Sequence, residues 1–263
     1  MNILYVGDVM GEYGVRTLRD VLPGVRREHV VDVVIAQAEN VSNGKGMNVI
    51  DYQILRDLGV DGFSGGNHTV ADKDIYSLLG DPNVPVTGPA NMPDCPGPGF
   101  KYIGTGAKKV LMVSLLGQIV GRDAEKPTEN PLHVIDSILK SQEDVSRAAT
   151  VVNFHGDYSS EKVVIGHYLD GRVTAVVGDH WHVPTADARI LAAGTAHMSD
   201  VGMCGALDSS LGVSYKSIIP RWRDGTQTRN VLAASGTRQF NALLIAVNDK
   251  GLANSVKHVQ IYL

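Results

Sequence analysis

The sequence predicts an α/β fold in which one domain, residues 1–263, is built on two β-sheets. Through most of the chain, short apolar runs alternate with longer amphipathic ones, which is the pattern of βαβ crossovers and of a largely parallel sheet. The tail differs, because residues 239–247 and 254–262 alternate apolar with polar side chains on either side of Asn-Asp-Lys-Gly, as in an antiparallel hairpin. No internal repeat or low-complexity linker divides the sequence, and this favours one domain over two.

The individual elements follow from the same patterns. Strands are expected at residues 2–6, 31–36, 62–64, 109–115, 150–154 and 172–177, and helices at residues 15–29, 49–58, 72–79 and 132–141. Pro23 is expected to kink or break the first helix, because proline has no backbone N–H to donate. Residues 81–99 are rich in proline and glycine and predict a long irregular connection.

Composition and charge exclude several classes of protein. The net charge of −4 argues against a general binder of nucleic acid or of anionic membranes, although a site that holds metal ions can still bind a small phosphate. No apolar run approaches the roughly 18 residues that span a bilayer, and the first ten residues resemble a strand more than a signal peptide. Cys95 and Cys204 form no C-x-x-C pair, and two free thiols fit a reducing compartment. We therefore expect a cytoplasmic protein.

Polar side chains of one chemical kind follow five of the predicted strands. They are Asp8, Glu39, Asn40, Asn67, His68, His155, His180 and His182. Because ligands bind at the carboxyl ends of strands in open α/β sheets, we expect these side chains to lie close together. Taken singly, Asp8 and Asn67 could cap helices, Glu39 could be an ordinary loop residue, and His155 could be a hydrogen-bonded core histidine. The pair His180 and His182 is the strongest metal signal, and the coincidence of all five strand ends favours a metal site.

The candidate ligands narrow the choice of metal. Carboxylate, amide and imidazole groups without a thiolate suit iron, manganese or zinc, and they argue against a purely structural zinc site. Without His68, the side chains listed above are seven candidate ligands, which are too many for one tetrahedral ion. With one shared carboxylate, they fit two ions.

The order of these motifs resembles that of the calcineurin-like metallophosphoesterases, which carry D-x-H, G-D, G-N-H, H and G-H-x-H in turn. Two departures stand out: Met10 takes the place of a metal-binding histidine, and Glu39 takes the place of a bridging aspartate. Both departures match the YmdB-like branch, as do E-N-x-x-x-G-K-G at 39–46 and G-N-H-T at 66–69. Shorter motifs of that branch, P-A-N, S-E-K and D-V-G-M, occur at 89–91, 160–162 and 200–203. The resemblance extends from Ile3 to about Pro220.

The resemblance implies a four-layer α/β/β/α sandwich of two mixed sheets and a metal-dependent phosphodiesterase that hydrolyses cyclic nucleotides such as 2′,3′-cAMP. It also implies two metal ions, with iron expected first and manganese second. One ion would be held by Asp8, Glu39, Asn40 and His182, and the other by Glu39, Asn67, His155 and His180. A metal-activated hydroxide would attack phosphorus, and His68 would protonate the leaving group.

Several alternatives stay open on the sequence alone. The same fold and metals could serve a phosphomonoesterase or a nuclease, and a regulatory or scaffold protein could retain a metal site. The expected partner is a small phosphodiester, with no extended nucleic acid and no membrane, and a homo-oligomer is compatible with the sequence. The loop at residues 42–46 could place backbone amides and Lys45 against a phosphate or form an ordinary turn. Asp157, two residues after His155, could tune that ligand or be solvated, and the solvated state is expected.

Overall fold

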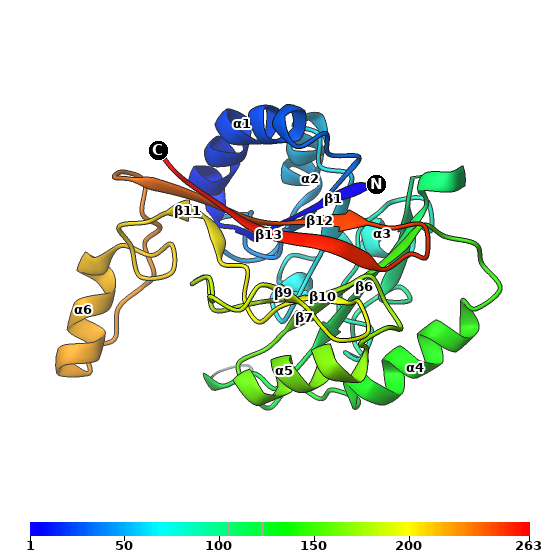
Figure 1. The fold of residues 1–263 in the computed structure, drawn as a ribbon. Coiled ribbons are helices and arrows are strands. Elements are labelled where there is room, and N and C mark those ends of the chain that lie inside the picture. The colour runs from blue at the N-terminus through cyan, green and yellow to red at the C-terminus, as the bar shows by residue number, and fades with distance from the viewer. Residues whose placement is uncertain (105, 122–123) are drawn as a thin grey trace.

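The computed structural model describes residues 1–104, 106–121 and 124–263. Two β-sheets lie face to face, and helices cover the outer face of each (Figure 1). The predicted α/β/β/α sandwich of two mixed sheets is therefore confirmed. Within the described residues, no helix is long and apolar enough to cross a membrane.

The first sheet has seven strands over the described residues. They are β1 (Asn2–Val6), β2 (Asp8–Val9), β3 (Val33–Gln37), β4 (Gly62–Ser64), β11 (Met203–Ala206), β12 (Arg238–Val247) and β13 (Ala253–Tyr262). Their order is β2-β11-β12-β1-β3-β4, with β13 paired to β12. Strands β1, β3 and β4 run parallel, whereas β12 is antiparallel to β1, β11 and β13. The predicted C-terminal hairpin is the β12–β13 pair.

The second sheet has six strands over the described residues. They are β5 (Phe100–Ile103), β6 (Val110–Leu116), β7 (Ala149–His155), β8 (Ala175–Asp179), β9 (Arg189–Ile190) and β10 (Ala196–Met198). Their order is β5-β6-β7-β8-β10-β9. The four middle strands are parallel, and the two edge strands are antiparallel to their neighbours. Strands β7 and β8 therefore end at the same edge of this sheet.

Three apolar layers hold the sandwich together. The central layer lies between the sheets, where Ile3 and Ile35 of the first sheet share one buried cluster with Met112 and Val177 of the second. The outer face of the first sheet packs against α1 (Gly11–Glu28), α2 (Val49–Asp57) and α3 (Ile75–Gly80). The outer face of the second sheet packs against α4 (Pro131–Ser141) and α5 (Ser159–Tyr168). Burial of apolar area in these layers supplies the main driving force for folding.

Some local expectations were wrong or incomplete. Helix α1 continues through Pro23, which lies at an exposed position and does not break the helix. Helix α5, helix α6 (Tyr215–Asp224) and strands β2, β5, β9, β10 and β11 were not predicted. Helix α6 stands at one side of the sandwich (Figure 1). Cys95 and Cys204 are free thiols, as expected, and burial raises the pKa of each to about 12.

Candidate metal centre

The carboxyl ends of strands from both sheets meet at one edge of the sandwich. Strands β1, β3 and β4 bring Asp8, Glu39, Asn40, Asn67 and His68 from the first sheet, and strands β7 and β8 bring His155, His180 and His182 from the second. All eight side chains singled out in the sequence lie within one connected set of short contacts.

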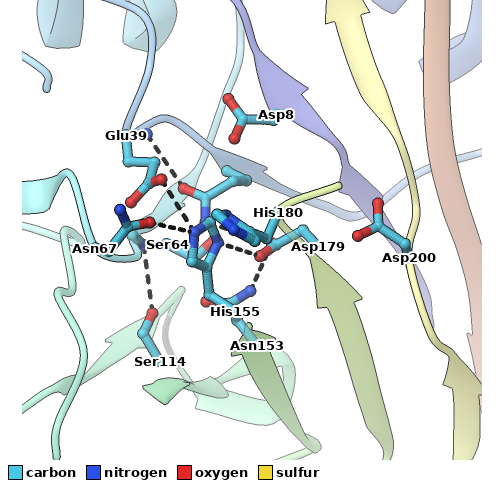
Figure 2. Close-up of polar contacts among 12 residues, drawn as sticks. Asp8, Glu39, Ser64, Asn67, Ser114, Asn153, His155, Asp179, His180 and Asp200 are labelled. Atoms are coloured by element: carbon cyan, nitrogen blue, oxygen red, sulfur yellow. Dashed lines mark hydrogen bonds and ion pairs between the residues drawn. The ribbon is translucent and has the colours of Figure 1, made fainter. Parts of the chain in front are cut away.

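One group of four side chains gathers around His155. The Nε2 atom of His155 lies 3.1 Å from Glu39 Oε1 and 2.9 Å from Asn67 Oδ1. The ring of His180 meets the ring of His155 edge to face, with 4.5 Å between centroids. One candidate ligand atom each from Glu39, His155 and His180 lies within 4.8 Å of the others, close enough to hold a single metal ion. Figure 2 shows Glu39 and Asn67 reaching toward His155.

A second group of three lies on the other side of Glu39. His182 Nε2 is 3.2 Å from Asp8 Oδ2, and Asn40 Nδ2 is 2.9 Å from the same oxygen. His68 connects the two groups, because its Nδ1 lies 2.7 Å from Asn40 Oδ1 and 3.7 Å from Glu39 Oε1. The backbone N–H of His68 also donates to Glu39 Oε2 over 2.9 Å.

Two carboxylate oxygens in this cluster have no hydrogen-bond partner among the described residues. Asp8 Oδ1 and Glu39 Oε1 are both buried, one in each group. A buried carboxylate oxygen that accepts no hydrogen bond is costly, and a nearby cation offsets that cost. Glu39 Oε1 lies 3.1 Å from His155 Nε2, which offsets part of it, and a bound metal ion would offset it further. The group formed by Glu39, His155 and His180 therefore fits a metal ion, and Asp8 and His182 are two more possible donors in the second group.

Close packing at the cluster depends on Gly66. A side chain there would overlap the ring of His155 and the carboxylate of Glu39. Residue 66, the second residue after β4, must therefore be glycine if Glu39 and His155 are to approach each other across the sheets.

The charges of the cluster shift its pKa values in opposite directions. Burial would raise the pKa of Glu39, but the charges of His155 and His68 outweigh it and lower that pKa well below its ordinary range. Burial would lower the pKa of His155, but Glu39 and Asp179 outweigh it and raise that pKa to about 10. Burial and the charge of His155 together lower the pKa of His180 to about 4.

His155 is oriented from behind by the fully buried Asp179. Its Nδ1 lies 2.7 Å from Asp179 Oδ1, and Asn153 donates to Asp179 Oδ2 over 2.6 Å (Figure 2). Tyr5 also donates to Asp179 Oδ2, over 2.7 Å. A carboxylate on the far nitrogen of a ligand histidine fixes the tautomer and the ring orientation. Asp179 directly precedes His180 in the sequence, whereas no sequence motif marks Tyr5 or Asn153.

The loop that carries His180 and His182 has an unusual backbone. Both histidines have positive φ, 105° and 61°, a conformation that costs on the order of 1–3 kcal/mol for a residue other than glycine. The buried Lys162 supports this loop from α5, since its Nζ donates to Asp179 O (2.5 Å) and to Asp200 Oδ2 (2.9 Å). Asp200 also accepts a hydrogen bond from the backbone N–H of Trp181 over 2.8 Å. The S-E-K and D-V-G-M motifs thus meet beneath the loop.

Asp157 is not simply solvated, contrary to expectation. Its Oδ1 lies 3.2 Å from His180 Nε2, and its Oδ2 accepts a hydrogen bond of 2.7 Å from the backbone of Val120. The side chain is about one-fifth exposed. Its partner in the cluster is therefore His180 and not the adjacent His155.

The cluster opens into a cleft of about 1050 Å³. Met10, Lys45, His68 and His180 line its inner part, and residues 225–230, which follow α6, line another part. In the loop at residues 42–46, the amide of Lys45 donates to the carbonyl of Ser42, which is the hydrogen bonding of an ordinary turn. The side chain of Lys45 nevertheless lines the cleft.

Comparisons with known proteins agree with this architecture. A family model described as YmdB-like protein matches residues 4–259. The chain is 35% identical over 257 residues to the 2′,3′-cyclic-nucleotide 2′-phosphodiesterase of Bacillus subtilis, an alignment that covers 95% of this chain and 92% of that protein. Two solved structures are similar over the whole of this chain. One is a hypothetical protein from Thermus thermophilus (35% identity, TM-score 0.89, 99% of that chain covered), and the other is a novel phosphatase from Mycoplasma pneumoniae (25%, 0.90, 93%).

Proposed function

Because this chain belongs to the YmdB-like protein family, we propose that it is a metal-dependent phosphodiesterase that hydrolyses 2′,3′-cyclic nucleotides. The main support is the convergence of seven oxygen and nitrogen donors in two groups at the inner end of a cleft. The name of the Bacillus subtilis relative supports the choice of substrate. A regulatory protein with a vestigial site would have no need of a complete ligand set.

The two groups would hold one ion each and share Glu39. Asp8, Glu39, Asn40 and His182 would hold the first ion, and Glu39, Asn67, His155 and His180 would hold the second. The donors, mixed nitrogen and oxygen ligands without a thiolate, suit iron, manganese or zinc, and the resemblance to the family puts iron first and manganese second. Bound ions would polarise the phosphate and lower the pKa of water in the site.

Asn40 would have to turn its amide over to serve as a ligand. Its Nδ2 faces Asp8 and lies 3.5 Å from His182 Nε2, while its Oδ1 faces His68. An amide nitrogen cannot bind a cation, whereas the oxygen can. With the amide reversed, Nδ2 would donate to Nδ1 of His68, which would leave the proton of a neutral His68 ring on Nε2.

His68 is the candidate proton donor to the leaving ribose oxygen. It lines the cleft beside the cluster, and it is the member of the set to which no ligand role is assigned. Burial, reinforced by the charge of Lys45 and opposed by that of Glu39, lowers the pKa of His68. The protonated form is then a minority at neutral pH, so turnover should decline as pH rises if this proton is used.

The test compares His68→Ala with Glu39→Ala in protein loaded with iron or manganese. We expect His68→Ala to keep both ions and to lose about 10²–10⁴-fold in turnover of 2′,3′-cAMP, whereas Glu39→Ala should lose metal. His133→Ala, on the exposed side of α4, is the matched control and should change neither. Equal metal loss in the first two variants, or turnover of 3′,5′-cAMP or p-nitrophenyl phosphate in preference to 2′,3′-cAMP, would contradict the proposal.

A further inference from the structure

The cleft is larger than one cyclic nucleotide requires. Pockets for small ligands occupy about 300–1,000 Å³, and this one, at about 1050 Å³, lies at or above the top of that range. It extends from Asn67 and His180 in the metal centre to Arg229 and Asn230 beyond α6. A mononucleotide with its phosphate at the metal centre would leave much of this space to water.

The walls of the cleft are positively charged, although the chain as a whole has a net charge of −4. Among the described residues that line it, Lys45, Arg221 and Arg229 are basic and none is acidic. The guanidinium of Arg221 has hydrogen-bond partners within the wall of the cleft, because it donates to the carbonyl of Thr228 over 2.6 Å and to Asn230 Oδ1 over 3.0 Å. Within the described part of the chain, Lys45 and Arg229 have no ion-pair or hydrogen-bond partner for their side chains, so both charges are available to a ligand.

An exposed aromatic side chain follows Arg221 on α6, although it is not among the residues that line the cleft. Trp222, one residue after Arg221 on α6, is 84% exposed. Residues 215–230 contain four basic side chains and one acidic one. Basic side chains that follow a phosphate backbone, together with aromatic rings on which bases stack, are the usual means of binding single-stranded nucleic acid.

Building on the proposed function, we propose that the preferred substrate is the 2′,3′-cyclic phosphate end of a short single-stranded RNA. In such an end, the next phosphate is attached to the 5′ oxygen of the ribose that carries the reacting phosphate. With the cyclic phosphate at the metal centre, the preceding phosphates would extend along the cleft and contact Lys45 and Arg229, and a preceding base would stack on Trp222. The acidic balance of the rest of the chain limits this contact to a few nucleotides.

The reaction opens the ring and leaves the RNA chain intact. The oxygen of one water bonds to phosphorus, and the bond from phosphorus to one ribose oxygen breaks. One proton of that water remains on the new phosphate or passes to solvent, and the other is given up from the site. The freed ribose oxygen gains one proton, which His68 supplies in the proposed mechanism, so the protons balance. The product is the same RNA with a terminal phosphomonoester.

The test compares 2′,3′-cAMP with a tetra-adenylate that ends in a 2′,3′-cyclic phosphate. We expect kcat/KM to be about tenfold or more higher for the tetranucleotide, and Arg229→Ala to remove most of that gain. Arg27→Ala, an equal loss of charge at the exposed end of α1, is the matched control. The logarithm of KM should rise with the logarithm of salt concentration, with a slope lower by about 0.7 in the Arg229 variant. Fluorescence anisotropy with a 3′-phosphorylated tetra-adenylate measures binding without turnover.

The possible failures can be told apart. Hydrolysis of 2′,3′-cAMP with no preference for the tetranucleotide, or Arg229→Ala behaving like Arg27→Ala, would overturn this inference and leave the proposed function standing. Failure to hydrolyse either substrate would overturn the proposed function and this inference with it. If Trp222→Ala alters the oligomeric state but not the binding of the tetranucleotide, α6 serves a protein contact and the stacking role is wrong.

Discussion

Replacing Lys162 by methionine should destabilise the protein strongly, although the two side chains have similar volumes. Lys162 and Asp200 are both fully buried, and Lys162 Nζ also lies 4.2 Å from the centre of the Trp181 ring. Lys162→Met leaves the carboxylate of Asp200 buried without its cation. Removing one partner of a buried ion pair costs about 3–5 kcal/mol, which in a protein of this size lowers the melting temperature by roughly 10 °C.

The measurement is the free energy of unfolding in urea, made on chelator-treated protein so that metal binding does not contribute. The double variant Lys162→Met/Asp200→Asn removes both charges and should recover at least half of the loss, since no buried charge is then left unpaired. Lys140→Met, at an exposed position of α4, is the matched control and should change stability by less than about 0.5 kcal/mol. A loss below about 1 kcal/mol in the single variant, or no recovery in the double variant, would refute the reasoning.

Three further outcomes are expected from the contacts around the metal centre. Asp179→Asn should weaken metal binding about 10–100-fold by calorimetry, because the ring of His155 loses its carboxylate, and unchanged affinity would exclude the orienting role. In the metal-free protein, the pKa of His155 is raised from 6.5 to about 10, so the stability from its charge is complete below pH 6.5 and is lost as pH rises through 10. A melting temperature that stays constant across that range would contradict the ion pair with Glu39. Gly66→Ala should abolish metal uptake, whereas Gly24→Ala, which meets nothing within 4 Å on α1, should retain it and stabilise by about 0.4–1 kcal/mol.

Much of the sandwich could be predicted because several of its strands have strong local signals. The strands at 2–6 and 62–64 are apolar runs bounded by glycine or polar residues, and the structure has β1 and β4 at the same bounds. The convergence of the candidate ligands could also be predicted, since carboxyl ends of parallel strands share an edge. The assignment of each ligand to one of two ions stays a prediction.

The supporting contacts could not be predicted, for physical reasons. Helix α5 exposes Val163 and Val164 on its outer side and buries Lys162, so its sequence lacks the usual apolar stripe. The partner of Lys162 lies 38 residues further along the chain, and only the folded chain brings the two together. Strands β9 and β10, of two and three residues, are too short for an alternating pattern to appear. Asp157 was misjudged because the turn after β7 directs it toward His180, in the loop that follows the neighbouring strand β8.

The candidate ligands come from both sheets, with Asp8, Glu39 and Asn67 on one side and His155 and His180 on the other. Ions coordinated by residues of both sheets would link the two sheets, and their binding free energy would add to the free energy of folding. A shortage of the metal would then reduce the stability of the fold as well as the activity. The fraction of folded protein would fall, and the amount of protein would depend on the supply of the metal.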